Sequence, residues 1–181
     1  FRGHSRGGAI ANLLASYVDG AAGGSHVLAT AEDVRAYTFA TPNSTSSDDA
    51  RSSRYDNIFN VLNPSDLVPQ LPLSGWGYER YGRDVWLPGG GDEGFDDVLA
   101  KMRASYLKTM GTECPADPAD RERAAAFVSA LGAGVGSFDE LVSPAGLYDI
   151  AAAAVGTGID VSSLLASHYP NTYIAWLDAL R

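Results

Sequence analysis

The first residues of the chain carry a glycine-rich pattern around a serine. The segment Gly3-His4-Ser5-Arg6-Gly7-Gly8 matches Gly-x-Ser-x-Gly, with a further glycine behind it. This pattern is typical of a tight strand-to-helix turn, where the residues two before and two after the serine must be very small. The following helix N-terminus favours negative charge, and the backbone N–H of Arg6 is placed to donate to an oxyanion. The pattern therefore predicts Ser5 as a nucleophile. The residues expected to support the turn are Gly3, His4, Gly7 and Gly8.

A nucleophilic serine needs a histidine as its base, and the base needs a carboxylate that orients it. The chain has three histidines. We expect His4, inside the serine motif, to support packing or hydrogen bonding. We expect His26, in the loop after the first helix, to have a solvated structural role. His168 lies late in the chain, in a predicted short loop just before the final helix, and is the predicted general base.

Asp66 is the predicted acid. The α/β-hydrolase fold places its three catalytic residues in the chain order Ser, Asp or Glu, then His. Asp66 lies a few residues beyond a predicted strand that ends at Leu62, and Pro64 and Pro69 flank it. The fixed φ of proline holds such a loop rigidly. Three other aspartates lie in or beside a polar loop and are expected to be solvated: Asp48, Asp49 and Asp56.

The elements that must position these residues follow from the apolar spacing. Residues 6–17 have apolar side chains at three- and four-residue intervals, which predicts a helix. Residues 34–40 and 57–62 are rich in β-forming residues and end at Thr-Pro and Asn-Pro, which predicts two strands. Helix, strand, loop and strand in this order favour the α/β class, with a mostly parallel sheet and flanking helices.

Beyond residue 76 the pattern becomes helical. Residues 78–87 predict one more strand or a hairpin, and helices are expected over 95–110, 120–131, 138–155 and 172–180. We predict that residues 1–87 and 160–181 form an α/β-hydrolase base, and that residues 88–159 form a helical insertion or cap.

Composition limits the partners. The 181 residues include 13 basic and 22 acidic side chains, for a net charge of −9, which works against nucleic acid as a partner. No apolar run approaches the eighteen or so residues that a membrane span needs. The one cysteine excludes an internal disulfide. The chain opens inside an apparent strand end, so we expect an N-terminal portion to be absent from this chain, either removed or supplied outside it.

Three segments together resemble the class 3 lipases, the fungal triacylglycerol lipase type. They are the serine motif with the Ala-Ile-Ala-Asn-Leu-Leu-Ala that follows it, Tyr-Thr-Phe-Ala-Thr-Pro at 37–42, and Val-Leu-Asn-Pro-Ser-Asp-Leu-Val-Pro at 61–69. The resemblance extends over 1–87 and 160–178. It implies an α/β-hydrolase fold in which Ser5 attacks an ester carbonyl, His168 carries the proton and Asp66 orients His168. It also implies a lipid or small-molecule ester substrate, and catalysis without a metal or organic cofactor.

The sequence departs from this family in two respects. Arg6 stands where the family usually has leucine, and the gap between Asp66 and His168 is longer than usual because of the predicted insertion. Three alternatives therefore stay open. The same triad serves another α/β-hydrolase, such as a thioesterase or a peptidase. The chain could also be a non-catalytic module that keeps the motif, or an inactive fragment.

Overall fold

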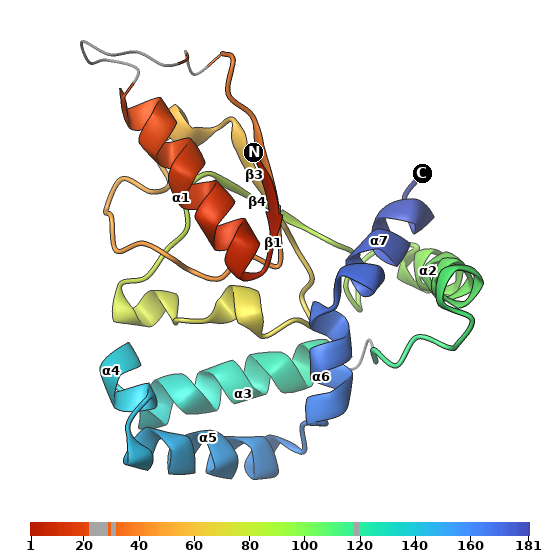
Figure 1. The fold of residues 1–181 in the computed structure, drawn as a ribbon. Helices are drawn as coiled ribbons and strands as arrows, with labels where there is room; N and C mark the ends of the chain where they lie inside the picture. Colours follow the sequence, from red (N-terminus) through yellow and green to blue (C-terminus); the bar gives the residue numbers. More distant parts are fainter. Residues whose placement is uncertain (22–28, 30–31, 118–119) are drawn as a thin grey trace. The chain divides into compact units, whose positions relative to one another are not determined.

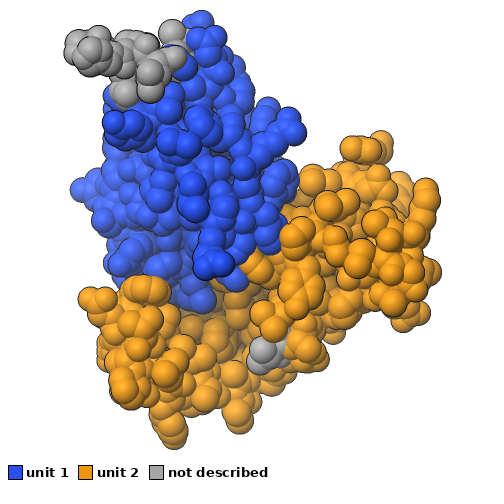
Figure 2. Space-filling model, viewed as in Figure 1, with its two compact units in different colours: residues 1–62, 68–86 blue, residues 63–67, 87–181 orange. Residues whose placement is uncertain are grey.

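The structure is a computed structural model that describes residues 1–21, 29, 32–117 and 120–181. The chain divides into two compact units, which Figure 2 colours separately. Unit 1 is Phe1–Leu62 with Val68–Trp86, and unit 2 is Asn63–Leu67 with Leu87–Arg181. Each unit is described below by itself.

Unit 1 is built on a parallel sheet of four strands. The strands are β1 (Arg2–His4), β2 (Ala36–Phe39), β3 (Ile58–Leu62) and β4 (Arg83–Trp86), and they neighbour one another in that order. Each neighbouring pair is parallel. Short 3-10 helices occupy the connections at Ser53–Tyr55, Val68–Gln70 and Ser74–Trp76. The sheet agrees with the predicted α/β class. Residues 78–87 contribute a strand and not a hairpin, because β4 pairs with β3.

Helix α1 (Arg6–Ala21) runs along one face of this sheet (Figure 1). Its buried side is small and polar, whereas two of the apolar residues that predicted the helix, Ile10 and Tyr17, are 66% and 70% exposed. The apolar spacing therefore located the helix correctly but does not mark the face that is buried in this structure. The side chains that α1 buries include Ala11, Asn12, Ala15 and Ser16.

A buried hydrogen-bond network joins α1 to the middle of the sheet. Asn12 Nδ2 donates to Asn60 Oδ1 at 2.9 Å and to the Tyr81 carbonyl at 2.8 Å, and Asn12 Oδ1 accepts from the Tyr81 N–H at 3.0 Å. The Thr38 hydroxyl donates to the same Asn60 oxygen at 2.7 Å. Asn12, Thr38 and Asn60 have no exposed surface. Because each amide arm has a partner, burying these groups avoids the penalty of unsatisfied polar atoms.

A second polar cluster ties β4 to the ends of other elements. Arg80 is buried, and its Nε lies 2.9 Å from Asp84 Oδ1. Its Nη1 donates to the carbonyls of Thr41 and Pro69, each at 2.6 Å. Arg51 Nη2 lies 3.0 Å from the other Asp84 oxygen. Burial alone would raise the pKa of Asp84, but the hydrogen bonds and charges of Arg51 and Arg80 outweigh burial and lower it.

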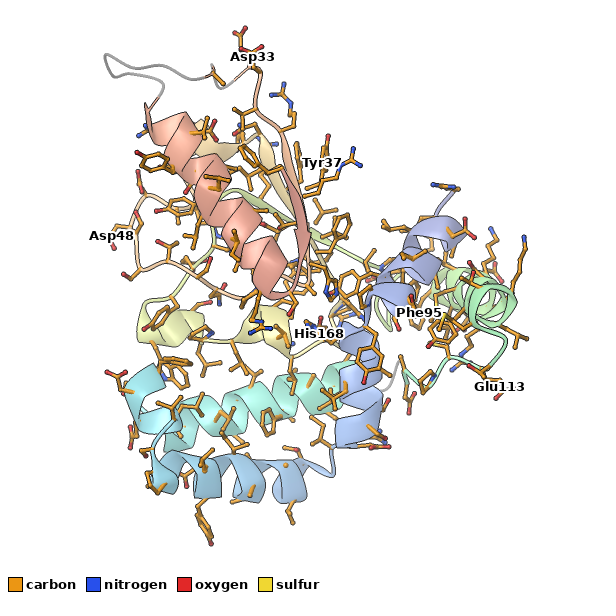
Figure 3. The ribbon with its side chains drawn as sticks, viewed as in Figure 1. Asp33, Tyr37, Asp48, Phe95, Glu113 and His168 are labelled. Atoms are coloured by element: carbon orange, nitrogen blue, oxygen red, sulfur yellow. The ribbon has the colours of Figure 1, made fainter. Side chains whose placement is uncertain are left out.

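Unit 2 is helical. Its helices are α2 (Phe95–Met110), α3 (Asp120–Gly134), α4 (Phe138–Leu141), α5 (Pro144–Thr157), α6 (Val161–His168) and α7 (Pro170–Ala179). Helix α2 has the predicted bounds and packs against α7, where the rings of Phe95 and Trp176 have centroids 6.0 Å apart. Phe95 is labelled at the start of α2 in Figure 3. The division into a base and a cap remains a prediction.

Helix α6 corrects one detail of the sequence analysis. His168 was expected in a loop, but it is the last residue of α6. Tyr169 is both the C-cap of α6 and the N-cap of α7, so one extended residue separates the two helices. Pro170 can open α7 because the first residue of a helix needs no N–H donor.

Among the described residues, no individual helix combines the length and apolar character required to cross a membrane. Pro144–Thr157 and Ser162–His168 meet the length and composition test only as a pair, and they are bent by 101° relative to each other.

The polar cluster of Asp84, Arg80 and Arg51 yields a test of the fold. We expect Asp84→Asn to lower the free energy of unfolding at pH 7 by about 3 kcal/mol, because it leaves the Arg80 guanidinium buried without its counter-charge. Urea unfolding followed by circular dichroism measures this. Asp56→Asn is the matched control, since Asp56 pairs with Arg83 at an exposed position, and its midpoint should change little. An equal fall in the urea midpoint of the two variants would show that Asp84 is no more important to stability than the exposed Asp56.

The same carboxylate predicts a pH dependence. The pKa of Asp84 is lowered in the folded state, so its contribution to stability is present above about pH 4 and is lost as the pH falls further. The urea midpoint of the parent should therefore drop more between pH 5 and pH 3 than that of Asp84→Asn. If the urea midpoints of the two proteins fell in parallel between pH 5 and pH 3, Asp84 would not be the source of the pH dependence.

Candidate active site

Ser5 lies at the junction of β1 and α1. It has a φ of 57°, in the left-handed region that non-glycine residues seldom adopt. Two backbone hydrogen bonds hold it there: its N–H donates to the Phe39 carbonyl at 2.9 Å, and its carbonyl accepts from the Ala9 N–H at 3.0 Å. Such a conformation costs on the order of 1–3 kcal/mol and persists only where its surroundings impose it. The predicted strained turn at Ser5 is therefore present.

The glycines of the motif are not equivalent. A Cβ at Gly3 would lie 2.0 Å from the Gly7 carbonyl oxygen. A Cβ at Gly8 would lie 2.4 Å from Thr41 Oγ1 and 3.0 Å from the Phe39 carbonyl oxygen. At Gly7, by contrast, a Cβ would meet nothing within 4 Å in the described part of the chain. The expectation that the residue two after the serine must be very small is thus not met at Gly7, and the close approach occurs at Gly8.

Arg6 is the first residue of α1 and is exposed. The first N–H groups of a helix have no acceptor within the helix. The Arg6 N–H is therefore available by helix geometry to donate to an anion next to Ser5. His4 is the last residue of β1 and is half-buried.

Asp66 and His168 form a hydrogen-bonded pair within unit 2. His168 Nδ1 lies 2.9 Å from Asp66 Oδ2, although 102 residues separate the two in the chain. The Asp66 side chain has no exposed surface, and 16% of the His168 side chain is exposed. His168 is labelled in Figure 3. A carboxylate that accepts from Nδ1–H favours the tautomer in which Nε2 carries no proton, the arrangement that a general base requires.

Tyr173, on α7, is a second donor to the same carboxylate. Its hydroxyl donates to Asp66 Oδ2 at 2.9 Å and accepts from the Asn63 N–H at 3.0 Å. Tyr173 is 2% exposed. The sequence analysis did not assign it a role, because neither its spacing nor its type indicates that it contacts Asp66.

The structure brings the predicted acid and base together in unit 2, while the predicted nucleophile belongs to unit 1. Asp48 and Asp49 are exposed, as expected. Asp56 instead pairs with Arg83. His26 lies outside the described residues. In the described part of the chain, no group of three or more His, Cys, Asp or Glu side chains could hold a metal ion.

Comparison with known families agrees with the motif at the start of the chain. The family model described as lipase (class 3) matches residues 1–76. Over these residues the chain is consistent with a class 3 lipase. The match implies an α/β-hydrolase fold and supports a hydrolase that acts on esters. It includes Ser5 and Asp66 and ends before His168. No protein in a curated set matches the chain.

The unequal glycines give a direct test of the turn. We expect Gly3→Ala to lower the free energy of unfolding by about 2–3 kcal/mol, because its methyl group would overlap the Gly7 carbonyl and force the backbone apart. Gly7→Ala should be neutral or stabilising by up to about 1 kcal/mol, because alanine is the better helix former and the site is open. Urea unfolding of the two variants measures the difference. Similar losses at both positions would contradict the described turn.

Proposed function

We propose that this chain is a serine-dependent carboxylic ester hydrolase that acts through a Ser5–His168–Asp66 triad and an acyl-enzyme. The observation that carries the proposal is the 2.9 Å contact between Asp66 Oδ2 and His168 Nδ1. An imidazole oriented by a buried carboxylate is what a serine nucleophile requires from its base. The left-handed conformation of Ser5 and the class 3 lipase match over residues 1–76 support the same chemistry.

The proposed reaction has two halves. Ser5 Oγ attacks the ester carbonyl carbon while its proton passes to His168 Nε2, and Asp66 stabilises the resulting imidazolium through Nδ1–H. The tetrahedral oxyanion accepts a hydrogen bond from the Arg6 N–H. The C–O bond of the ester then breaks, and the alcohol leaves with the proton from His168. Water attacks the acyl-enzyme by the same route, releasing the carboxylic acid and restoring Ser5.

The family match favours a lipid ester as substrate. A panel of p-nitrophenyl esters from acetate to palmitate is the first substrate test, because it ranks the acyl-chain lengths that the enzyme accepts. Thioester and amide substrates belong in the same panel. Turnover confined to either of these would replace the ester proposal with the thioesterase or peptidase alternative.

Labelling by a fluorophosphonate probe tests the triad without knowledge of the substrate. We expect the folded chain to label, Ser5→Ala not to label, and an exposed serine variant, Ser46→Ala, to label as the parent does. His168→Ala and Asp66→Asn should lower kcat on a p-nitrophenyl ester by roughly 10³–10⁴-fold, because each leaves Ser5 without an oriented base. A folded parent that neither labels nor turns over any ester of the panel would contradict the proposal and favour a non-catalytic module.

A further inference from the structure

Asn63 bonds the residue that directly precedes each member of the Asp66–His168 pair. Its Nδ2 donates to the Ser167 carbonyl at 3.0 Å, and its Oδ1 accepts from the Ser65 N–H at 3.1 Å. Ser167 directly precedes His168, and Ser65 directly precedes Asp66. A single amide thus holds the peptide next to the acid with one arm and the peptide next to the base with the other.

The backbone of Asn63 takes part in the same arrangement. Its carbonyl accepts from the Asp66 N–H at 3.0 Å, which closes a turn over residues 63–66. Its N–H donates to the hydroxyl of Tyr173, which in turn donates to Asp66. Asn63 is 3% exposed, and Ser65, Asp66, Ser167 and Tyr173 are buried too. The four groups of Asn63 therefore all bond within one buried network.

We infer that Asn63 is a positioning residue that sets the relative placement of Asp66 and His168. The inference rests on the proposed function, since it assigns Asn63 to the same triad. Asn63 does not bond either side chain of the pair with its own amide. It acts through the backbone on each side, and hydrogen bonds in a buried site hold geometry more firmly than they do in water.

The choice of asparagine follows from the geometry. The site needs one donor and one acceptor on a short planar group, and the asparagine amide supplies both. An aspartate at this position would keep the acceptor for the Ser65 N–H but could not donate to the Ser167 carbonyl. A leucine would fill a similar volume and make neither bond. The aspartate variant therefore tests the hydrogen bond to the Ser167 carbonyl alone. The leucine variant removes both hydrogen bonds while keeping a similar side-chain volume.

The expected effect is on kcat and not on KM. We expect Asn63→Leu to lower kcat on a p-nitrophenyl ester by about 10–100-fold, since a misplacement of about 1 Å has an effect of that size. KM should stay within about twofold, because Asn63 is 3% exposed and all four of its polar groups bond within the protein. Asn63→Asp should lose at least tenfold in kcat, because the bond to the α6 backbone is the one it cannot make.

Asn12→Leu is the matched control. Asn12 is another fully buried asparagine whose amide has all its arms bonded, and it lies in unit 1. Its loss should lower the urea midpoint, as the loss of Asn63 does, but leave kcat per folded molecule near that of the parent. A fall in kcat of equal size in Asn12→Leu would show that the effect of Asn63 is general destabilisation, and would overturn the inference.

A readout that does not require turnover separates this inference from the proposed function. In the ¹⁵N-labelled protein, the Nδ1 proton of His168 should give a downfield, slowly exchanging resonance that is absent in His168→Ala. We expect Asn63→Leu to broaden or remove it and Asn12→Leu to keep it. A sharp, parent-like resonance together with parent-like kcat in Asn63→Leu would overturn the inference. A parent that shows the resonance but does not label at Ser5 would contradict the proposed function alone.

Discussion

The buried carboxylate of Asp66 is the constraint that the rest of unit 2 must satisfy. A carboxylate with no exposed surface is costly unless donors surround it. Its donors come from 102 and 107 residues further along the chain, at His168 on α6 and Tyr173 on α7. Helices α6 and α7 must therefore return to the segment that follows β3. The extended Tyr169 between them allows the two donors to come from different helices.

Unit 1 has its own constraint at Ser5. A left-handed serine between a strand and a helix persists only where its surroundings impose it. Within the motif, Gly3 and Gly8 leave no room for a Cβ, so strand and helix approach closely there. The β2 strand takes part because the Phe39 carbonyl accepts from the Ser5 N–H. The parallel order of β1 and β2 is thus needed for the turn as well as for the sheet. Glycine at positions 3 and 8 of the motif thus has a steric origin.

Local features were predictable from the sequence, whereas long-range partners were predictable only where the expected chain order of a catalytic triad supplied them. The spacing of apolar residues predicted the bounds of α2, and the glycine pattern predicted the turn at Ser5. Both features depend on residues that are neighbours in the chain. The expected chain order identified Asp66 and His168, which the structure pairs. No role was predicted for Asn63 or Tyr173, because their roles depend on contacts more than 100 residues away in the chain. The buried face of α1 was missed for the same reason, since its acceptors belong to β3 and to Tyr81.

The polar face of α1 determines how this helix lies on the sheet of unit 1. Apolar side chains of similar size pack in several rotations of a helix, whereas an amide with three hydrogen bonds fits only one. Asn12 is such a residue, two turns beyond Ser5 on α1, and it bonds both Asn60 and Tyr81. The rotation of α1 is therefore fixed at its start by the close packing of Gly3 and Gly8 and further along by directional hydrogen bonds. The buried asparagines Asn12 and Asn63 therefore differ in what they hold: the first fixes α1 on the sheet of unit 1, whereas the second bonds the segments that carry Asp66 and His168.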